Sequence, residues 1–326
     1  MQHYLRTSRW VVADATGLAV GTNCTVRRWV GAEAASLLEE VRKRNVFSRH
    51  AGAGDFYFQR AEALHGATVI DISSSRWTST DLLAKEAQIA ENVVATSFIL
   101  SGSRREFVRC VVGVPQPYLD LNLVRRGSDL DVSSTSVAAK APSGLKLDGR
   151  IASRYKRNGF PALYDFAVTE CDLASRIRAS LIWLMESRTE AVVYSALVKT
   201  ATALESLLVI GKEPATRALA ERGAYLLSAG PEEREKLSRA TLRFYDIRGE
   251  IVHGKRSAEP LAVERALEYG DRITVLLALV LSAQGAAWKS VNDVQAYCDR
   301  ARWGYPAACK RPWGRVQVRR ALDRLA

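Results

Sequence analysis

Short apolar and β-branched runs, separated by Gly, Ser and Asp clusters, characterise the chain from Trp10 to about Leu130. Runs of this kind are typical of β-strands, and we expect strands at Trp10–Ala13, Cys24–Val30, Thr68–Ile72, Thr96–Leu100 and Phe107–Val114. Two segments have the spacing of an amphipathic helix instead: Ala32–Arg44 and Ser79–Val94. This alternation predicts an α+β domain over residues 1–132.

The hydrophobic pattern changes at Pro161, after which apolar residues recur at helical spacing. Residues 133–160 are rich in Ser, Ala, Gly and Lys and predict a linker. Gly and Pro residues divide the helical part into five expected helices: Ala162–Glu186, Thr189–Ile210, Ala215–Ser228, Glu232–His253 and Pro260–Gln284. Gly254 is expected to cap the fourth, and the apolar fifth is expected to be the central helix or a subunit interface. Short connections predict an all-α helical bundle over residues 161–288.

The chain has 326 residues and a formal net charge of +12, so its surface is expected to attract polyanions. Nucleic acid fits best, because no long basic amphipathic helix indicates a membrane role. The five cysteines lie far apart without a C-x-x-C pair, which favours reduced thiols over a zinc site. The longest apolar run, Ile273–Leu281, is too short to cross a bilayer, and the N-terminus lacks an apolar signal segment. We therefore expect a cytoplasmic protein without a membrane partner.

The expected fourth helix ends in the segment F-Y-D-I-R-G-E-I-V-H-G-K, which contains Arg248 and His253. A guanidinium is suited to phosphate oxygens, and an imidazole exchanges protons near neutral pH. The pair therefore predicts a site that binds and cuts a phosphodiester. Similar spacing occurs at Arg60–His65 and Arg44–His50, so the spacing alone is not specific. Those pairs fall in the first domain, where we expect solvated helix ends.

A second motif, Gly127-Ser128-Asp129-Leu130-Asp131, is similar to the elements with which nucleotidyltransferases hold metal and a nucleoside triphosphate. In that family a helical turn separates the Gly-Ser element from the acidic pair. The residues V-S-S-T-S after Asp131 do not predict a strand, so a polar loop is the preferred interpretation. A nucleotidyltransferase would need magnesium-dependent triphosphate binding near Asp129 and Asp131.

Three successive segments of the helical part resemble the Apea-like branch of the HEPN superfamily: T-A-L-E-S-L-L, K-E-P-A-T-R-A-L-A-E-R-G-A-Y-L-L and F-Y-D-I-R-G-E-I-V-H-G-K. The resemblance covers about Ala162–Ala287 and does not extend to the first domain. Its most specific part is Y-D-I-R-x-x-I-V-H-G at the end of a bundle helix. It implies a HEPN-like bundle that acts as a homodimer and cleaves RNA without a metal or another cofactor.

In that family the Arg-x4-6-His motifs of two subunits meet in a cleft, so the resemblance implies Arg248 and His253 as catalytic residues. Residues five apart on an ideal helix point about 140° away from one another, so one subunit alone makes an awkward site. The expected nucleophile is the RNA 2′-hydroxyl, with His253 as general base or acid and Arg248 neutralising charge on the phosphate. The expected products are a 2′,3′-cyclic phosphate and a 5′-hydroxyl.

Three further residues are expected to support the site: Glu205, Tyr245 and Asp246. Glu205 is expected to hold the Arg248 guanidinium. Each also has a plainer interpretation, Tyr245 as a core residue and the two acids as solvated charges. Gly249 follows Arg248 where many active members have Asn, Asp or His. This departure keeps open a second hypothesis, a catalytically silent HEPN module that binds RNA or a partner protein.

Residues 289–326 form an expected basic, aromatic C-terminal extension, in which rings stack on bases and cations contact phosphates. The expected RNA-binding residues in and near it are Lys255, Arg256, Arg302, Trp303, Lys310, Arg311 and Trp313. The alternative is a solvated tail whose aromatics pack on the bundle. The resulting hypothesis is a toxin-like or antiviral defence endoribonuclease acting on RNA, with tRNA among the candidates. The first domain is then expected to sense or regulate, with a phage-derived or other activator as its partner.

Overall fold

The computed structural model describes residues 2–8, 11–14, 17–30, 68–75, 78–101, 117–126, 129–138, 145–254, 259–305, 309–313 and 316–325, together with residues 32, 35, 36 and 39. The chain divides into two compact units. The sheet unit is Met1–Val94 with Cys110–Ser153, and the helical unit is Ala95–Arg109 with Arg154–Ala326. An α+β region followed by a helical region is the predicted fold class, and at this level the prediction is confirmed.

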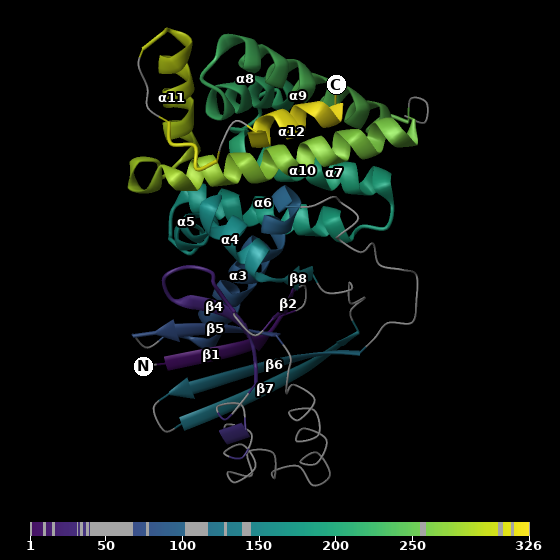
Figure 1. Ribbon diagram of the computed structural model, residues 1–326. Coiled ribbons are helices and arrows are strands. Elements are labelled where there is room, and N and C mark those ends of the chain that lie inside the picture. The colour runs from purple at the N-terminus through teal and green to yellow at the C-terminus, as the bar shows by residue number, and fades with distance from the viewer. Residues whose placement is uncertain are drawn as a thin grey trace. The chain divides into compact units, whose positions relative to one another are not determined.

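The sheet unit contains a six-stranded sheet in the order β3-β4-β5-β1-β6-β7, with every neighbouring pair antiparallel (Figure 1). Its strands are β1 (Gln2–Thr7), β3 (Leu18–Ala19), β4 (Cys24–Arg28), β5 (Thr68–Ser74), β6 (Pro117–Arg126) and β7 (Asp129–Ala138). A separate parallel pair consists of β2 (Val11–Ala13) and β8 (Leu145–Leu147). Strand β1 pairs with β5 and β6, which lie far away in the sequence, so the sheet depends on long-range pairing.

Helix α3 (Thr80–Ser101) packs on one face of this sheet through strand β1. Alternate residues of β1 face it, including Tyr4, which is fully buried, and Arg6. The Arg6 guanidinium donates to the carbonyl oxygen of Ala84 at 3.5 Å and to Oε1 of Gln88 at 3.4 Å. The donors of this buried arginine are thus hydrogen-bonded to acceptors on α3, as a buried polar group requires.

Two secondary-structure predictions in the first part of the chain are wrong. Thr96–Leu100 belongs to α3 rather than to a strand, because these residues are buried all round and show no amphipathic period that would separate helix from strand. The V-S-S-T-S segment after Asp131 is a strand rather than a loop, since β7 pairs with β6 along its whole length. Residues 133–138, predicted as linker, therefore belong to the sheet, and β8 and α4 (Gly149–Arg157) also fall inside the predicted linker.

The helical unit consists of helices joined by short connections. They are α5 (Phe160–Ala167), α6 (Asp172–Thr189), α7 (Val193–Leu208), α8 (Ala215–Leu227), α9 (Pro231–Val252), α10 (Pro260–Ala283), α11 (Val291–Arg302) and α12 (Val316–Leu325), with a short 3-10 helix, η2 (Gly285–Ala287). The predicted bounds of α7 to α10 are confirmed to within a few residues. The predicted helix Ala162–Glu186 is instead two helices, α5 and α6. The chain breaks there because Thr169 Oγ1 donates to the Phe166 carbonyl and Cys171 Sγ accepts from the Ala174 amide, which starts α6.

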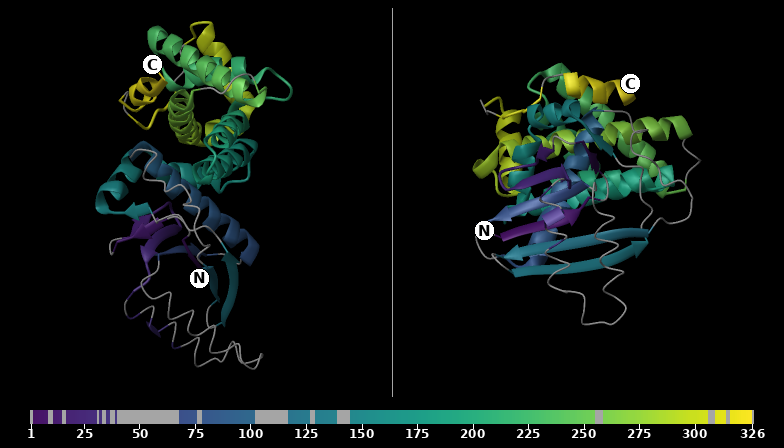
Figure 2. Two further views of the ribbon diagram at one scale, coloured as in Figure 1. Left: turned by 90° about the vertical axis from the view of Figure 1, so that its right-hand side faces the viewer. Right: turned by 60° about the horizontal axis from the view of Figure 1, so that its bottom comes forward.

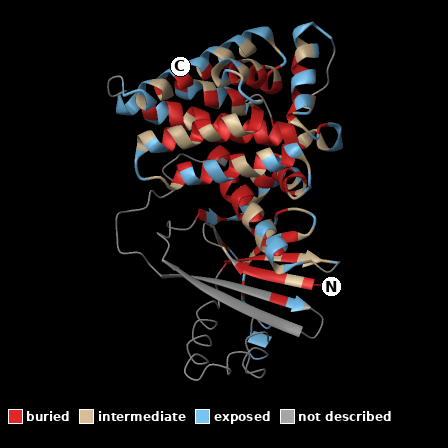
Figure 3. Ribbon diagram, turned by 180° about the vertical axis from the view of Figure 1, so that it is seen from behind, coloured by how far each residue is buried: buried red, intermediate tan, exposed pale blue. Residues whose placement is uncertain are grey.

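Helix α10 is the central helix of the unit, with α7, α9 and α12 beside it (Figures 1 and 2). Every residue from Tyr269 to Ser282 is buried (Figure 3). Gly270 allows its close approach to α7 and α9, because a Cβ atom there would lie 2.6 Å from Phe244 Cε2 and 2.7 Å from Thr200 Cγ2. Although α10 is apolar, no described helix is long and apolar enough to cross a membrane.

Replacing Gly270 with Ala should destabilise the helical unit by about 1–3 kcal/mol, the usual cost of overpacking a core. Alanine is the better helix former by about 1 kcal/mol, so the effect runs against helix propensity. Gly249→Ala is the matched control, because no atom lies within 4 Å of the added Cβ on α9. Urea unfolding of both variants checks the prediction. Equal stabilities would show that α10 does not need a glycine at this crossing.

Candidate functional site

Helix α9 carries the predicted motif and ends inside it. The helix ends at Val252, His253 is its C-cap residue, and Gly254 follows with a left-handed φ of 63°. The His253 amide donates to the Gly249 carbonyl at 3.0 Å, which closes the last helical turn. The predicted cap at Gly254 is confirmed, and Arg248 lies in the final turns of the helix.

Arg248 lies half-buried close to Tyr245 on the same helix. The Glu205 carboxylate of α7 is near enough to Tyr245 to act on its hydroxyl electrostatically. The Arg248 Nε and the Tyr245 Oη are both buried, and neither has a hydrogen-bond partner of normal geometry in the described part of the chain. No ion pair joins Glu205 to Arg248 among the described residues. The predicted contact between them is therefore not formed within one chain, although Tyr245 lies within reach of both.

The Tyr245 hydroxyl is held in its neutral form. Burial raises the pKa of Tyr245 far above its usual value, Glu205 raises it further, and Arg248 lowers it in part. The ring also packs edge-on against Phe244, with centroids 5.3 Å apart. Tyr245 therefore has the core position that its plainer interpretation requires, and its hydroxyl can act as a hydrogen-bond donor but not as a base.

His253 is exposed, whereas Arg248 is half-buried. This difference agrees with helical geometry, which turns side chains five residues apart by about 140°. A single chain therefore does not present the imidazole and the guanidinium on one face of α9. Asp246 is also exposed, and it makes no ion pair with any residue that the structure describes, so its side chain is a solvated charge in the isolated chain.

Two of the predicted RNA-binding arginines contact helix α8. Arg302 forms an ion pair with Glu221. Arg311 donates through Nε to the Leu226 carbonyl at 2.8 Å and through Nη2 to the Tyr225 carbonyl at 3.0 Å. These carbonyls belong to the last turn of α8, so Arg311 satisfies a helix C-terminus rather than facing solvent with free donors.

The other predicted RNA-binding residues differ in exposure. Trp313 is only 8 % exposed, so its ring packs on the helical unit and offers no face to a base. Trp303, in contrast, is 77 % exposed, and Lys310 is exposed as well. Lys255 and Arg256 lie outside the described residues. The alternative of an aromatic packed on the bundle thus holds for Trp313 and not for Trp303.

The rival motifs are placed only in part. Asp129 and Asp131 lie in β7 at one edge of the sheet, opposite Arg126 and Val124 of β6. The remaining rival residues lie outside the described part of the chain: Arg44, His50, Arg60, His65, Gly127 and Ser128.

A buried polar network joins α6, α7 and α10, and none of its members was among the predicted site residues. Arg188 Nη1 donates to Asp271 Oδ2 at 2.7 Å, with side-chain exposures of 3 % and 1 %. Thr200 Oγ1 donates to Asp271 Oδ1 at 2.9 Å, and the Ser187 hydroxyl lies 2.7 Å from Thr200 Oγ1. The available sequence signal is the pair Asp271-Arg272 inside an apolar run, because charged residues are rarely buried without a partner.

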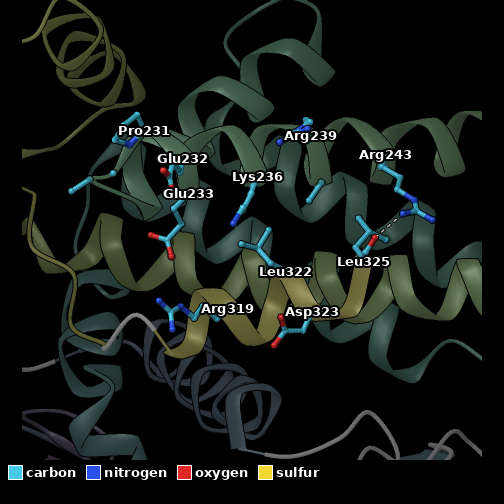
Figure 4. A pocket seen from close by; sticks show the side chains of 13 residues that line it. Pro231, Glu232, Glu233, Lys236, Arg239, Arg243, Arg319, Leu322, Asp323 and Leu325 are labelled. Atoms are coloured by element: carbon cyan, nitrogen blue, oxygen red, sulfur yellow. Dashed lines mark hydrogen bonds between the residues drawn. The ribbon is translucent and has the colours of Figure 1, made fainter.

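A cavity of about 970 Å³ lies between the first half of α9 and α12 (Figure 4). Charged side chains of both signs line it: Lys236, Arg239, Arg243, Arg319, Glu232, Glu233 and Asp323. Arg243 Nη1 donates to the Leu325 carbonyl at 2.9 Å and so ties α12 to α9. Neither Arg248 nor His253 lines this cavity, so the cavity and the motif occupy different parts of α9.

Replacing Tyr245 with Phe should not lower the stability of the helical unit. The hydroxyl lies near Glu205 but makes no hydrogen bond of normal geometry that would be lost, and removing an unsatisfied buried polar group is neutral or stabilising. Tyr269→Phe is the matched control, because Tyr269 Oη lies 2.8 Å from Thr241 Oγ1 and its loss should cost about 0.5–1.5 kcal/mol. Thermal unfolding compares the two. Equal losses in both variants would mean that Tyr245 Oη has a partner after all.

Comparison of this chain with family models, with curated proteins and with solved structures returned no match. The class of protein therefore rests on the fold and the motif themselves. These are an α+β unit followed by a helical unit, with an arginine and a histidine five positions apart at the end of helix α9.

Proposed function

We propose that this protein is a HEPN-type endoribonuclease that cuts RNA without a metal ion and acts as a homodimer. The observation that carries the proposal is the end of α9. There Arg248 lies beside the buried Tyr245 hydroxyl, and His253 caps the helix with its ring exposed to solvent. The three segments that carry the family resemblance fall on α7, on the start and body of α8, and on the end of α9.

The chemistry uses the 2′-hydroxyl of the substrate. His253 takes the proton of this hydroxyl as the 2′-oxygen attacks the neighbouring phosphorus. The bond between phosphorus and the 5′-oxygen breaks, and the leaving oxygen receives a proton from a second imidazole or from water. Arg248 stabilises the negative charge that builds up on the phosphate oxygens. The products are a 2′,3′-cyclic phosphate and a 5′-hydroxyl, and DNA is not a substrate because it lacks the nucleophile.

A homodimer resolves the geometric difficulty of the single chain. Since Arg248 and His253 point in different directions on α9, a two-fold symmetric pair allows the arginine of one subunit to meet the histidine of the other. Exposed apolar side chains at this end of the helix support such an interface. Val252, next to His253, is 47 % exposed, and Leu261 in the first turn of α10 is 50 % exposed.

The biological role that we propose is a toxin-like or antiviral effector in the cytoplasm. In this role the sheet unit recognises an activator, such as a phage-derived molecule, and restrains cleavage until it binds. This part of the proposal rests on the family resemblance alone, since a fold does not fix a function.

Cleavage of total RNA and of tRNA by the purified full-length protein in EDTA tests the nuclease. We expect cyclic-phosphate and 5′-hydroxyl ends, and a rate about 10²–10⁴ lower in His253→Ala. Arg248→Ala should also be inactive. Arg239→Ala is the matched control, because this arginine lies on the same helix but lines the separate cavity. Ends that carry a 5′-phosphate, or undiminished cleavage by His253→Ala, would contradict the mechanism.

The second candidate is a silent HEPN module that binds RNA or a partner protein, and Gly249 favours it. Gly249 stands where many active members have a polar side chain. No atom lies within 4 Å of a Cβ at this position, so Asn fits without a clash. RNA binding without cleavage by the parent protein, together with cleavage by Gly249→Asn, would support this candidate over the active nuclease.

A further inference from the structure

Helix α11 ends in a rigid turn that presents two aromatic rings. Gly304 has a left-handed φ of 77°, and its amide donates to the Ala301 carbonyl at 3.3 Å. The Tyr305 amide donates to the Arg300 carbonyl at 3.1 Å. These two bonds form a Schellman motif, in which the backbone after the helix is fixed by the helix itself. The backbone positions of Trp303 and Tyr305, on either side of the glycine, are therefore fixed by these bonds.

Both rings are exposed to solvent. Trp303 is 77 % exposed and Tyr305 is 65 % exposed, and Figure 3 shows further exposed residues along α11. Neither side chain makes a ring contact or a hydrogen bond with any other described residue. Single exposed apolar residues are ordinary, but two large exposed rings that flank one glycine concentrate aromatic surface on a single turn. Packing within the described part of the chain does not account for them.

Basic side chains accompany the rings. Arg300 is exposed and makes no side-chain hydrogen bond or ion pair with a described residue. Arg302 is already paired with Glu221, which neutralises the nearest acid of α8. A free guanidinium beside aromatic faces is the combination that binds single-stranded nucleic acid, because rings stack on bases while the cation meets phosphate. The formal net charge of +12 also favours a polyanion as the occupant.

We propose that Trp303 and Tyr305 form a stacking platform for unpaired bases of RNA, with Arg300 contacting an adjacent phosphate. Cα atoms two residues apart lie at most about 7 Å from one another, and stacked nucleotides of one strand are spaced about 3.4 Å apart. The two rings are therefore within reach of successive bases of one strand. The choice of RNA over DNA rests on the proposed nuclease function, whereas the preference for single strands follows from the exposed rings.

The test is the affinity of the full-length protein for labelled single-stranded oligoribonucleotides of about 16 nucleotides. The His253→Ala background keeps the RNA intact during the measurement. Replacing Trp303 with Ala should weaken binding by about 5- to 150-fold, and Tyr305→Ala should act in the same direction. Trp303→Phe should retain most of the affinity, because it keeps a ring. Trp183→Ala is the matched control, since Trp183 is 40 % exposed but lies on α6.

The salt dependence separates stacking from phosphate contact. Trp303→Ala should leave the slope of log affinity against log salt unchanged, whereas Arg300→Gln should reduce it by about 0.7. Unchanged RNA affinity in both ring variants would overturn the proposal. So would a preference for duplex RNA over single strands, or a change in oligomeric state in Trp303→Ala without a change in RNA affinity. The last result would assign the rings to a protein interface.

The platform and the nuclease fail in distinguishable ways. If Trp303→Ala lowers RNA affinity but the parent protein leaves no cyclic phosphate, the platform stands and the nuclease fails. If the parent protein cleaves RNA and the ring variants bind and cleave as it does, the nuclease stands and the platform fails.

Discussion

A dimer with one Arg248→Ala subunit and one His253→Ala subunit should cleave RNA at about half the wild-type rate, because one of its two symmetric sites remains intact. This follows from helical geometry, because side chains five residues apart on an ideal helix point about 140° apart, and His253 is exposed whereas Arg248 is half-buried. If each site takes Arg248 from one subunit and His253 from the other, the mixed dimer unites the two unaltered side chains in one site. Each variant should be inactive as a homodimer.

A second mixed dimer provides the matched control. Here a wild-type subunit is paired with a subunit that carries both Arg248→Ala and His253→Ala. If each site is shared between the two subunits, this dimer is inactive, because each site lacks one residue. If each site is built within one chain, this dimer is half active and the first mixed dimer is inactive. Two affinity tags allow both heterodimers to be purified, and cyclic-phosphate formation in EDTA measures their rates. Reversed results in the two heterodimers would contradict the shared site.

The sequence predicts α7 to α10 well because glycine and proline mark their ends. Gly211 and Pro214 separate α7 from α8, and Pro231 and Pro260 occupy the first turns of α9 and α10. The strands are predicted less well, since a sheet is made of long-range pairs. Strand β1 lies between β5 and β6, and no local pattern records that register.

The candidate site shows the same division between local and tertiary information. The cap at Gly254 and the positions of Arg248 and His253 on α9 follow from local sequence. The missing contact between Glu205 and Arg248 does not, because it depends on how α7 packs against α9. Trp313 and Trp303 occur in similar basic segments, yet only Trp303 is exposed. Burial of a ring in a C-terminal extension is decided by its docking on other helices, which composition does not encode.

Replacing Asp271 with Asn should destabilise the helical unit by about 3–5 kcal/mol, because it leaves the buried Arg188 guanidinium without this carboxylate. The two side chains are 1 % and 3 % exposed and lie 2.7 Å apart, so water cannot take the place of the lost charge. Asn retains an oxygen that can accept from Thr200, which isolates the effect of the charge. For a unit of this size the melting temperature should fall by about 6–20 °C.

Two controls separate the buried pair from charge effects in general. Glu235→Gln breaks an exposed pair with Arg239, whose members are 67 % and 68 % exposed, and should cost less than about 1 kcal/mol. A double variant, Arg188→Met with Asp271→Leu, removes both charges and should regain most of the loss, because apolar residues of similar volume tolerate burial. If Asp271→Asn has the same melting temperature as the wild type, the pair does not hold α6 and α10 together. If the double variant melts at as low a temperature as Asp271→Asn, packing around Thr200 rather than the lost carboxylate charge sets the stability.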